Sequence, residues 1–303
     1  MSDKKHNCSI LVNSCDKYEV AWDPFFKLLK EQWPDCPFDI YLLTETKDYE
    51  CQYFPVKVIK TGARWPWGKM VKYAVKRIPT EFVIYLLDDE FLASPVNSEA
   101  LDKVLCYMKE HNDVGVVMLR HTPQQKVDIP EPLFERDKVL QDNFRIVGIS
   151  TLYRKKYFLK LLRVHENPWE YEYYASIRSR RYPEKVMQYN KSQPVIFDYD
   201  DSPVSGWGFT RGKWIKGTKE LFEKHHITVD FSKLGWYEPD YSDYEKYAWQ
   251  HNLELDKILP AGMTENKQST ISMRNLNICN PIQILKKFYV AIMDKIRIIK
   301  SLI

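Results

Sequence analysis

Residues 82–91 read FVIYLLDDEF, and this stretch decides the fold. Its first six residues, Phe82 to Leu87, form a continuous apolar run with the profile of a strand that is buried on both faces. Three carboxylates follow the run directly, from Asp88 to Glu90. Strands of this kind belong to parallel sheets that are covered by helices on both faces. The stretch therefore predicts an α/β protein with an acidic cluster at a strand end.

Strands and helices alternate around this segment. Another short apolar run, CSILVN at 8–13, ends in Ser14-Cys15-Asp16 and has the same profile. Apolar spacing predicts further strands at 38–43, 56–59 and 114–119, and helices around 22–33, 67–78 and 101–108. This alternation predicts an open, mostly parallel, Rossmann-like sheet with helices on both faces. Because ligands of such sheets bind outside the carboxyl ends of the strands, Asp16 and the acidic cluster are expected to line one crevice.

The second half of the chain has a less regular pattern. It predicts a long polar connection at 121–143, a strand at 144–153, a helix at 155–163, a loop at 165–172, a strand at 195–199, and a basic turn with a helix at 211–226. Residues 240–270 are expected to be irregular.

Composition and cysteine spacing exclude a disordered protein and argue against a zinc protein and a membrane-spanning one. The chain has 303 residues, of which 44% are hydrophobic, enough for a full globular core. Its six cysteines show no C-x-x-C spacing, so we expect no zinc site and a reducing, cytoplasmic setting. No run reaches the roughly 18 apolar residues of a membrane span.

The basic residues are concentrated at the C-terminal end. Residues 281–303 carry five cations and one acid, which accounts for the whole net charge of +4, so nucleic acid is not an expected partner. Apolar residues recur at helical spacing between these cations, which predicts a basic amphipathic helix lying in an anionic membrane surface. The alternative is a terminal helix that packs on the protein.

The acidic cluster Asp88-Asp89-Glu90 suits the chemistry of a diphosphate. Mg²⁺ and Mn²⁺ prefer carboxylate and phosphate oxygens, and either cation offsets the charge of a departing diphosphate. Adjacent acids at a strand end can divide the work, one holding the metal and another the ribose hydroxyls. The alternative is a turn or a helix N-terminus, where Asp is a good cap.

Five segments, taken in order, resemble bacterial surface-polysaccharide glycosyltransferases of the GT-A type. They are 13–18 (NSCDKY), 64–69 (RWPWGK), 86–92 (LLDDEFL), 166–172 (ENPWEYE) and 211–214 (RGKW), so the resemblance covers roughly residues 8 to 235. It implies a GT-A catalytic domain at 1–235, with a nucleotide-sugar-binding half at about 8–120 and an acceptor half at about 121–235. An irregular extension at 236–280 and the amphipathic helix at 281–303 would follow.

The resemblance also implies a donor site for an NDP-sugar, above all a UDP-sugar. Its candidates are Asn13, Asp16, Arg64, Trp67, Lys69, Asp88, Asp89, Arg211 and Lys213. The family's metal motif is DxD, whereas this chain has D-D-E, so Asp88, Asp89 and Glu90 all remain candidates for binding Mn²⁺ or Mg²⁺. Arg211 and Lys213 flank a glycine at an expected helix start, which suits a diphosphate, but a solvated basic turn fits equally well.

Other residues near the expected donor site have alternative interpretations. Trp65 and Trp67 are equally good hydrophobic anchors. His225 or His226 would be a third metal ligand, although a histidine at a helix end more often caps carbonyl groups. A further acidic group, Asp198, Asp200 and Asp201, precedes Pro203 and Gly206 and is better explained as a turn.

A second carboxylate site is expected about eighty residues further on. Inverting sugar transfer needs a general base that takes the proton of the acceptor hydroxyl. The resemblance assigns this role to Glu172, with Glu170 as the alternate, and it gives the acceptor the rings of Trp169, Tyr171, Tyr173 and Tyr174. The alternative is a surface loop whose Trp anchors it to the core and whose acids face water.

Taken together with these patterns, the resemblance implies an inverting glycosyltransferase of bacterial capsule or lipopolysaccharide synthesis, acting on a saccharide or polyprenyl-linked acceptor at the inner face of the cytoplasmic membrane. One rival is a sugar-nucleotide nucleotidyltransferase, which would need a glycine-rich loop after the first strand, where this chain has Ser14-Cys15-Asp16-Lys17. The other rival is a non-catalytic carbohydrate-binding protein with the same fold.

Overall fold

The computed structural model describes residues 7–120, 132–136, 145–200, 202–251 and 253–264. The chain divides into two compact units, Met1–Glu238 and Pro239–Ile303. The expected amphipathic helix at 281–303 lies outside the described residues, as does most of the polar connection at 121–143.

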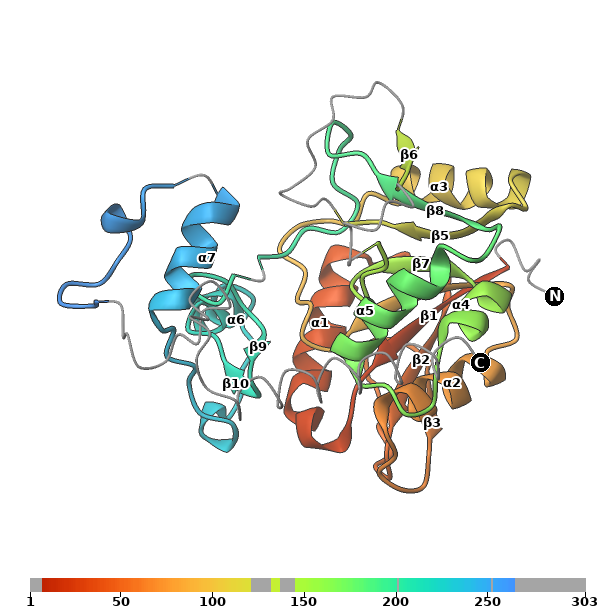
Figure 1. Cartoon of the computed structure of the whole chain (residues 1–303). Coiled ribbons are helices and arrows are strands. Elements are labelled where there is room, and N and C mark those ends of the chain that lie inside the picture. Colours follow the sequence, from red (N-terminus) through yellow and green to blue (C-terminus); the bar gives the residue numbers. More distant parts are fainter. Residues whose placement is uncertain (1–6, 121–131, 137–144, 201, 252, 265–303) are drawn as a thin grey trace, which may run out of the picture. The chain divides into compact units, whose positions relative to one another are not determined.

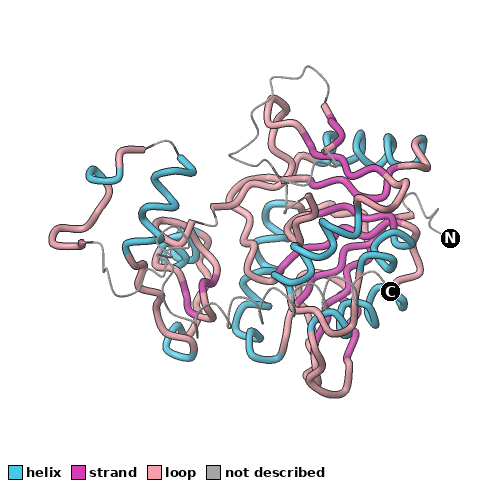
Figure 2. Tube along the Cα trace, viewed as in Figure 1, coloured by secondary structure: helices cyan, strands magenta, loops and turns pink. Residues whose placement is uncertain are grey.

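The first unit is built around an eight-stranded sheet with the strand order β3-β2-β1-β4-β7-β5-β8-β6 (Figures 1 and 2). The strands are β1 (Cys8–Asn13), β2 (Asp39–Thr44), β3 (Val56–Lys60), β4 (Phe82–Leu87), β5 (Val114–Met118), β6 (Leu133–Glu135), β7 (Thr151–Arg154) and β8 (Lys185–Tyr189). The first four pair in parallel, as do β5 and β8. β7 is antiparallel to β4 and β5, and β6 is antiparallel to β8. The expected α/β fold with a mostly parallel sheet is confirmed.

Helices cover both faces of the sheet because side chains of the central strands alternate between two cores. Ile10 and Ile84 face the core that contains α1 (Trp22–Gln32) and α3 (Ser98–Glu110). Leu11 and Val83 face the core that contains α2 (Trp67–Arg77), α4 (Lys155–Leu161) and α5 (Pro168–Ser179). β1 and β4 are almost fully buried, which is what their continuous apolar sequences predict.

Smaller elements complete the two units. In the first unit these are the 3₁₀ helices η1 (Asp16–Ala21) and η2 (Phe231–Lys233), the two-stranded hairpin of β9 (Phe209–Thr210) and β10 (Lys213–Trp214), and α6 (Gly217–Lys224). The described part of the second unit contains α7 (Tyr241–His251) and η3 (Leu255–Lys257). The irregular structure expected over 240–270 is therefore wrong at α7.

Several predictions for the second half of the chain are wrong in whole or in part. Of the strand expected at 144–153, only Thr151–Arg154 is a strand, and the described residues 145–150 before it are irregular. Residues 165–172 were expected to be a loop, but Pro168–Ser179 is helical because Asn167 caps the helix and Pro168 occupies its first turn. Residues 195–199 form no strand. Ile196 and Phe197 are buried because this segment bonds to the chain before α3, with the Asn97 amide donating to the Ile196 carbonyl at 3.1 Å.

None of the helices in the described part of the chain combines the length and the apolar character that crossing a membrane requires.

Candidate functional site

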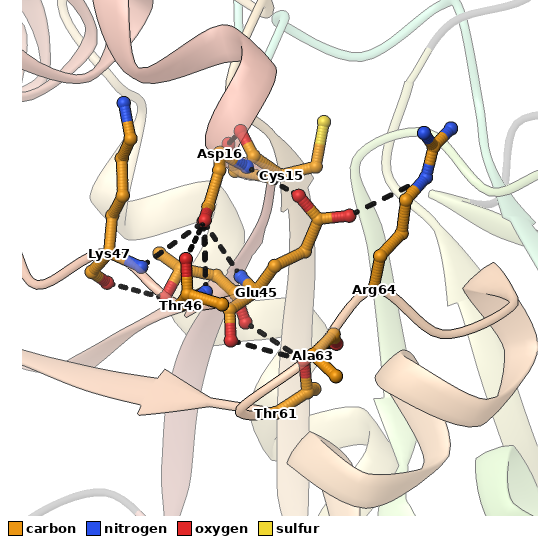
Figure 3. Close-up of polar contacts among 10 residues, drawn as sticks. Cys15, Asp16, Glu45, Thr46, Lys47, Thr61, Ala63 and Arg64 are labelled. Atoms are coloured by element: carbon orange, nitrogen blue, oxygen red, sulfur yellow. Dashed lines mark hydrogen bonds and ion pairs between the residues drawn. The ribbon is translucent and has the colours of Figure 1, made fainter.

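Asp16 ties together the loops at the carboxyl ends of β1 and β2 (Figure 3). Its carboxylate accepts hydrogen bonds from the backbone amides of Glu45 (2.9 Å) and Thr46 (3.0 Å) and from the Thr46 hydroxyl (2.5 Å). In return, the Asp16 amide donates to the Glu45 carboxylate at 3.2 Å. Arg64, in the loop after β3, places its Nε 3.8 Å from Oε1 of Glu45. Glu45 therefore lies in the middle of a polar network along this edge of the sheet.

The charge of Asp16 is used to hold the loop after β2. Burial raises the pKa of Asp16, but the hydrogen bonds from the Thr46 hydroxyl and from the amides of residues 45–47 outweigh it, so the pKa is lowered overall. Asp16 was predicted to bind the donor. Because both of its oxygens already accept bonds from the loop, any contact with a ligand would come in addition to this structural role.

Asp88 joins the end of β4 to the loop after β1. It is 5% exposed, its Oδ2 accepts a hydrogen bond from the Ser14 hydroxyl, and the Trp22 indole donates to the Ser14 oxygen at 2.6 Å. The Asp88 amide donates to the carbonyl of Asn13 at 3.3 Å. Burial, together with the charge of Asp89, holds the pKa of the Asp88 carboxyl well above its usual range.

Glu90 is held by two donors. Its Oε2 accepts from the backbone amide of Leu87 at 3.0 Å, and its Oε1 accepts from the hydroxyl of Ser150 at 3.1 Å. The side chain is 8% exposed. Burial raises the pKa of Glu90 to about 8, against the lowering effects of the Leu87 amide and the Arg120 charge.

A cavity of about 170 Å³ lies beside the acidic cluster. Its charged lining consists of Asp89, Glu90, Arg120 and Asp200, and its remaining lining is Leu87, Ile149, Tyr199, Trp207, Phe209 and Ile215. The Arg120 guanidinium lies over the Tyr199 ring, 5.7 Å from its centroid. Asp200 also forms the expected turn, because its carboxylate accepts from the Ser202 amide at 2.9 Å. Carboxylates, a guanidinium and ring faces therefore share one small volume.

The chain before and within β9 forms one wall of this cavity. The Trp207 indole donates to the Phe91 carbonyl at 2.7 Å. Gly208, at φ +95°, packs directly on the acidic cluster, since a Cβ there would come within 2.5 Å of the Asp89 carbonyl oxygen. The Phe209 ring stacks on Tyr18 with 5.0 Å between centroids.

Arg120, Trp207 and Phe209 line the cavity but were not among the predicted site residues. Arg120 directly follows an expected strand, and its place after a strand end was the signal available in the sequence. Trp207 and Phe209 carry no such signal, because a crossing of the chain brings them to the acidic cluster.

Arg211 and Gly212 lie in the turn between β9 and β10, not at the start of a helix as predicted. Their φ angles are +52° and +77°, as in a type I′ hairpin turn. A Cβ on Gly212 would come within 2.7 Å of the Lys17 amine, so this turn lies against η1. Arg211 and Lys213 are exposed. Lys17 is therefore a basic neighbour of this pair, although it was not among the predicted donor residues.

α5 presents the second carboxylate site. The Glu172 carboxylate accepts from the Gly148 amide at 2.8 Å, and burial raises the pKa of Glu172. Glu170 serves in the capping box of the helix: its Oε2 accepts from the Asn167 amide at 3.1 Å, while its own amide donates to the Asn167 side chain at 2.9 Å. Glu170 therefore holds the start of the helix, whereas Glu172 bonds to the chain before β7.

The predicted aromatic residues separate into exposed and buried ones. Trp169 is 77% exposed, and Tyr173 is partly buried. Tyr171 is 1% exposed and Tyr174 is 6% exposed. The prediction that Tyr171 binds the acceptor is wrong, because its ring packs on Trp67 in the core and its hydroxyl donates to Tyr153.

The RWPWGK segment is partly structural. The ring of Trp67 packs 5.2 Å from that of Tyr171, so Trp67 is a hydrophobic anchor of α2. The Lys69 amine lies over the Trp65 ring, 3.9 Å from its centroid. Arg64 is 92% exposed in its side chain and remains accessible from solvent.

Among the described residues, no group of three or more His, Cys, Asp or Glu side chains is arranged to hold a metal ion. Asp88 and Glu90 accept hydrogen bonds from protein donors. The acids of the cluster that line the cavity are Asp89 and Glu90. This arrangement fits a cation that takes one or two carboxylates from the protein and its other ligands from phosphate oxygens and water. His225 does not join the cluster, because its Nδ1 lies 2.7 Å from the Glu31 carboxylate.

No family model and no curated protein matches the chain. Its fold is similar to that of several solved structures. The 1–349 portion of S. aureus TarS is 15% identical, with a TM-score of 0.44 over 65% of this chain and 60% of that one. The galactosyltransferase LgtC, in complex with donor and acceptor sugar analogues, is 12% identical, with a TM-score of 0.43 over 74% of this chain and 98% of that one.

A CMP:2-keto-3-deoxy-manno-octonic acid synthetase complexed with CTP is 13% identical, with a TM-score of 0.38 over 60% of this chain and 88% of that one. Of the 1–349 portion of TarS, the match covers 60%, which is less than two thirds of its length. Likenesses of this degree concern the fold and carry nothing about substrate or activity.

Proposed function

We propose that this protein is a glycosyltransferase that takes its sugar from a nucleotide sugar, a UDP-sugar in the first instance. The observation that carries the proposal is the cavity at the carboxyl edge of the sheet, where Asp89 and Glu90 meet Arg120 and several aromatic rings. Ligands of open α/β sheets bind at this edge. The cavity is of a size for a single sugar ring, and the Asp16–Glu45–Arg64 network continues the polar surface along the loops after β1, β2 and β3.

The donor diphosphate is proposed to lie between the acidic cluster and the hairpin turn. Arg211 and Lys213 bind its oxygens and stabilise the charge that develops on the leaving group, and Lys17 adds a further cation. Asp89 would hold a divalent cation, Mn²⁺ or Mg²⁺, with Glu90 beside it and phosphate oxygens as the other ligands. When bound, such an ion offsets negative charge on the diphosphate.

The acceptor is proposed to approach α5. Glu172 takes the proton of the attacking hydroxyl, and its raised pKa suits a general base that works near neutral pH. The Gly148 amide keeps one of its oxygens in place. Trp169 and Tyr173 offer ring faces to a saccharide acceptor. A single displacement of this kind inverts the configuration at the anomeric carbon.

The proposal includes a cellular setting. The acceptor would be a saccharide or a polyprenyl-linked saccharide of bacterial surface polysaccharide, met at the inner face of the cytoplasmic membrane through residues 281–303. Sedimentation with anionic vesicles tests this setting. Reversal of the five cations Lys286, Lys287, Lys295, Arg297 and Lys300 should abolish binding, and unchanged binding would contradict the membrane role.

The test of the function itself is a panel of nucleotide sugars with purified protein, read as nucleoside diphosphate release, together with calorimetry of UDP in the presence of Mn²⁺. Release of diphosphate from one donor supports the proposal. Pyrophosphate formation from a nucleoside triphosphate and a sugar phosphate would instead favour a nucleotidyltransferase. Saccharide binding without any nucleotide binding would favour a carbohydrate-binding protein and overturn the enzyme proposal.

A further inference from the structure

Residues 146–150 connect the two carboxylate sites. The Ile146 amide donates to the Ser176 hydroxyl at 2.8 Å, and the Gly148 amide donates to Glu172 at 2.8 Å. Two residues later, the Ser150 hydroxyl donates to Glu90 at 3.1 Å. One short stretch of chain therefore bonds to α5 at one end and to the wall of the donor cavity at the other.

Ser150 has an unusual backbone for its residue type. Its φ angle is +40°, in the left-handed region that non-glycine residues seldom adopt, and it is completely buried. Such a conformation persists only where the surroundings impose it, and these conformations concentrate at functional sites. Here the Ser150 carbonyl accepts from the Leu119 amide at 3.0 Å, and the Thr151 hydroxyl donates to the Ile149 carbonyl at 2.8 Å. Both bonds fix the peptide units that flank Ser150.

The strained conformation of Ser150 matters because it directs the Ser150 hydroxyl toward the Glu90 carboxylate. Glu90 has one donor on each oxygen, the amide of Leu87 at the end of β4 and the hydroxyl of Ser150, the residue before β7. Removal of the hydroxyl would leave Oε1 of a buried carboxyl without this donor, and the carboxylate plane would be free to rotate about its remaining bond. Glu90 and Ile149 both line the cavity, so such a rotation would change the cavity itself.

We propose that Ser150 is a positioning residue. Its strained backbone directs a buried hydroxyl that fixes the Glu90 carboxylate at the wall of the donor cavity. The same short segment holds Glu172 through the Gly148 amide. The inference rests on the proposed function, because it takes the cavity to be the donor site. Ser150 touches no reacting atom and acts only through Glu90.

The experiment compares Ser150→Ala, Ser150→Gly and Glu90→Gln with the double variant Ser150→Ala/Glu90→Gln. Ser179→Ala is the matched control, since Ser179 is equally buried but bonds to Arg145 and the Ser176 carbonyl and not to Glu90. Each protein is titrated with UDP in the presence of Mn²⁺, and its thermal unfolding is recorded. A melting temperature separates a positioning effect from a loss of folding.

Ser150→Ala should raise the Kd for UDP with Mn²⁺ by up to about tenfold, since one hydrogen bond contributes about 1 kcal/mol and about 1.4 kcal/mol is a factor of ten. Ser150→Gly should bind UDP as weakly as Ser150→Ala, although it relieves the strained φ and should unfold at the same or a higher temperature than Ser150→Ala. In the Glu90→Gln background, Ser150→Ala should add little, because Ser150 affects the Kd only by positioning the Glu90 carboxylate, which this background lacks. Ser179→Ala should leave the Kd unchanged.

The outcomes separate the two proposals. If the wild-type protein binds no nucleotide, the proposed function fails and the inference fails with it. If the wild type binds UDP and either Ser150 variant binds it equally well, the inference alone is overturned. Additive effects of Ser150→Ala and Glu90→Gln on the Kd would also overturn it, because additivity means that Ser150 does not act through Glu90.

Discussion

Asp16 and Glu90 are both carboxylates at the carboxyl edge of one sheet, yet the protein treats them in opposite ways. Asp16 accepts bonds from the amides and the hydroxyl of a neighbouring loop, and its pKa is lowered. Glu90 is buried with fewer donors, and its pKa is raised to about 8. Glu172 resembles Glu90, since burial raises its pKa too. A carboxylate whose pKa is lowered by folding stabilises the folded state, whereas a buried carboxylate whose pKa is raised destabilises it when ionised. Carboxylates of the second kind concentrate at functional sites.

The largest effect is expected for Glu172, whose pKa is raised by burial. Glu172→Gln should lower turnover by about 100-fold or more, because a general base contributes about 10²- to 10⁴-fold. The Gln oxygen still accepts from the Gly148 amide, so the geometry is kept. Wild-type turnover should fall as the pH drops through the raised pKa of Glu172, since only the ionised carboxylate can accept a proton. The pH profile of kcat/KM measures this, with Glu170→Gln as the matched control.

Stability should respond to Glu172→Gln in the opposite direction. Because the pKa is raised in the folded state, the ionised carboxylate disfavours folding, and this cost grows as the pH rises through the window between the unfolded and folded pKa values. The variant should therefore be no less stable than the wild type at neutral pH in urea unfolding. A less stable but fully active variant would refute both the base assignment and the comparison with Asp16.

Asp89→Asn should give the next largest effect. Removal of the charge that faces the cavity should lower turnover by about 100-fold, because electrostatic stabilisation of the leaving group is worth several kcal/mol. The free energy of unfolding should change by less than about 1 kcal/mol. Asp48→Asn is the control, since Asp48 is exposed and pairs with Lys60. Equal activity of the two variants would remove Asp89 from the donor site.

Asp16→Ala should act mainly on stability. Loss of several bonds to a charged acceptor should cost about 2 kcal/mol in urea unfolding at neutral pH. The pKa of Asp16 is lowered in the folded state, so this stabilisation exists above the unfolded pKa and is lost as the pH falls through the folded one. The difference between variant and wild type should thus shrink in acid. If Asp16→Ala abolished UDP binding while its stability stayed unchanged, the contrast with Glu90 would break down.

The smallest effect is expected for the metal alone. Because the described carboxylates form no preformed cage, Mn²⁺ should bind at least about tenfold more tightly in the presence of UDP than in its absence. Calorimetric titration of Mn²⁺ with and without UDP measures the difference. Equal affinity in both titrations would mean that the protein alone supplies the ligands.

The first half of the fold was predictable because its signals are local. The strands at 8–13 and 82–87 were predicted with the bounds that the structure has, since a continuous apolar run leaves no choice of buried face. Helix α5 was also within reach of the sequence: Asn167 followed by Glu170 is a capping box, with Pro168 between them. The aromatic and acidic residues of this segment suggested a loop, but its capping box predicts a helix that begins at Pro168.

The rest of the site depends on contacts that no local pattern contains. Ile196 and Phe197 look like a strand because they are apolar, yet they are buried by the chain before α3 and not by a sheet partner. The hairpin around Arg211 has an Arg-Gly turn in place of the Asn-Gly or Asp-Gly pairs that usually mark a type I′ turn. The partners of Asp16 and Glu90, at Thr46 and Ser150, come from other loops, so pKa directions could not be read from the acidic residues themselves.

Gly208 limits how this protein can change its ligand. At this point the wall of the cavity is main chain packed on main chain, and any side chain would collide with the Asp89 carbonyl. Mutation can therefore reshape the cavity only through the side chains that line it, such as those of Arg120, Ile149 and Tyr199. Under the proposed function, relatives with a different sugar preference should keep the glycine and differ at positions such as these. A saturation library aimed at new donors should leave Gly208 unchanged and can begin with these three positions.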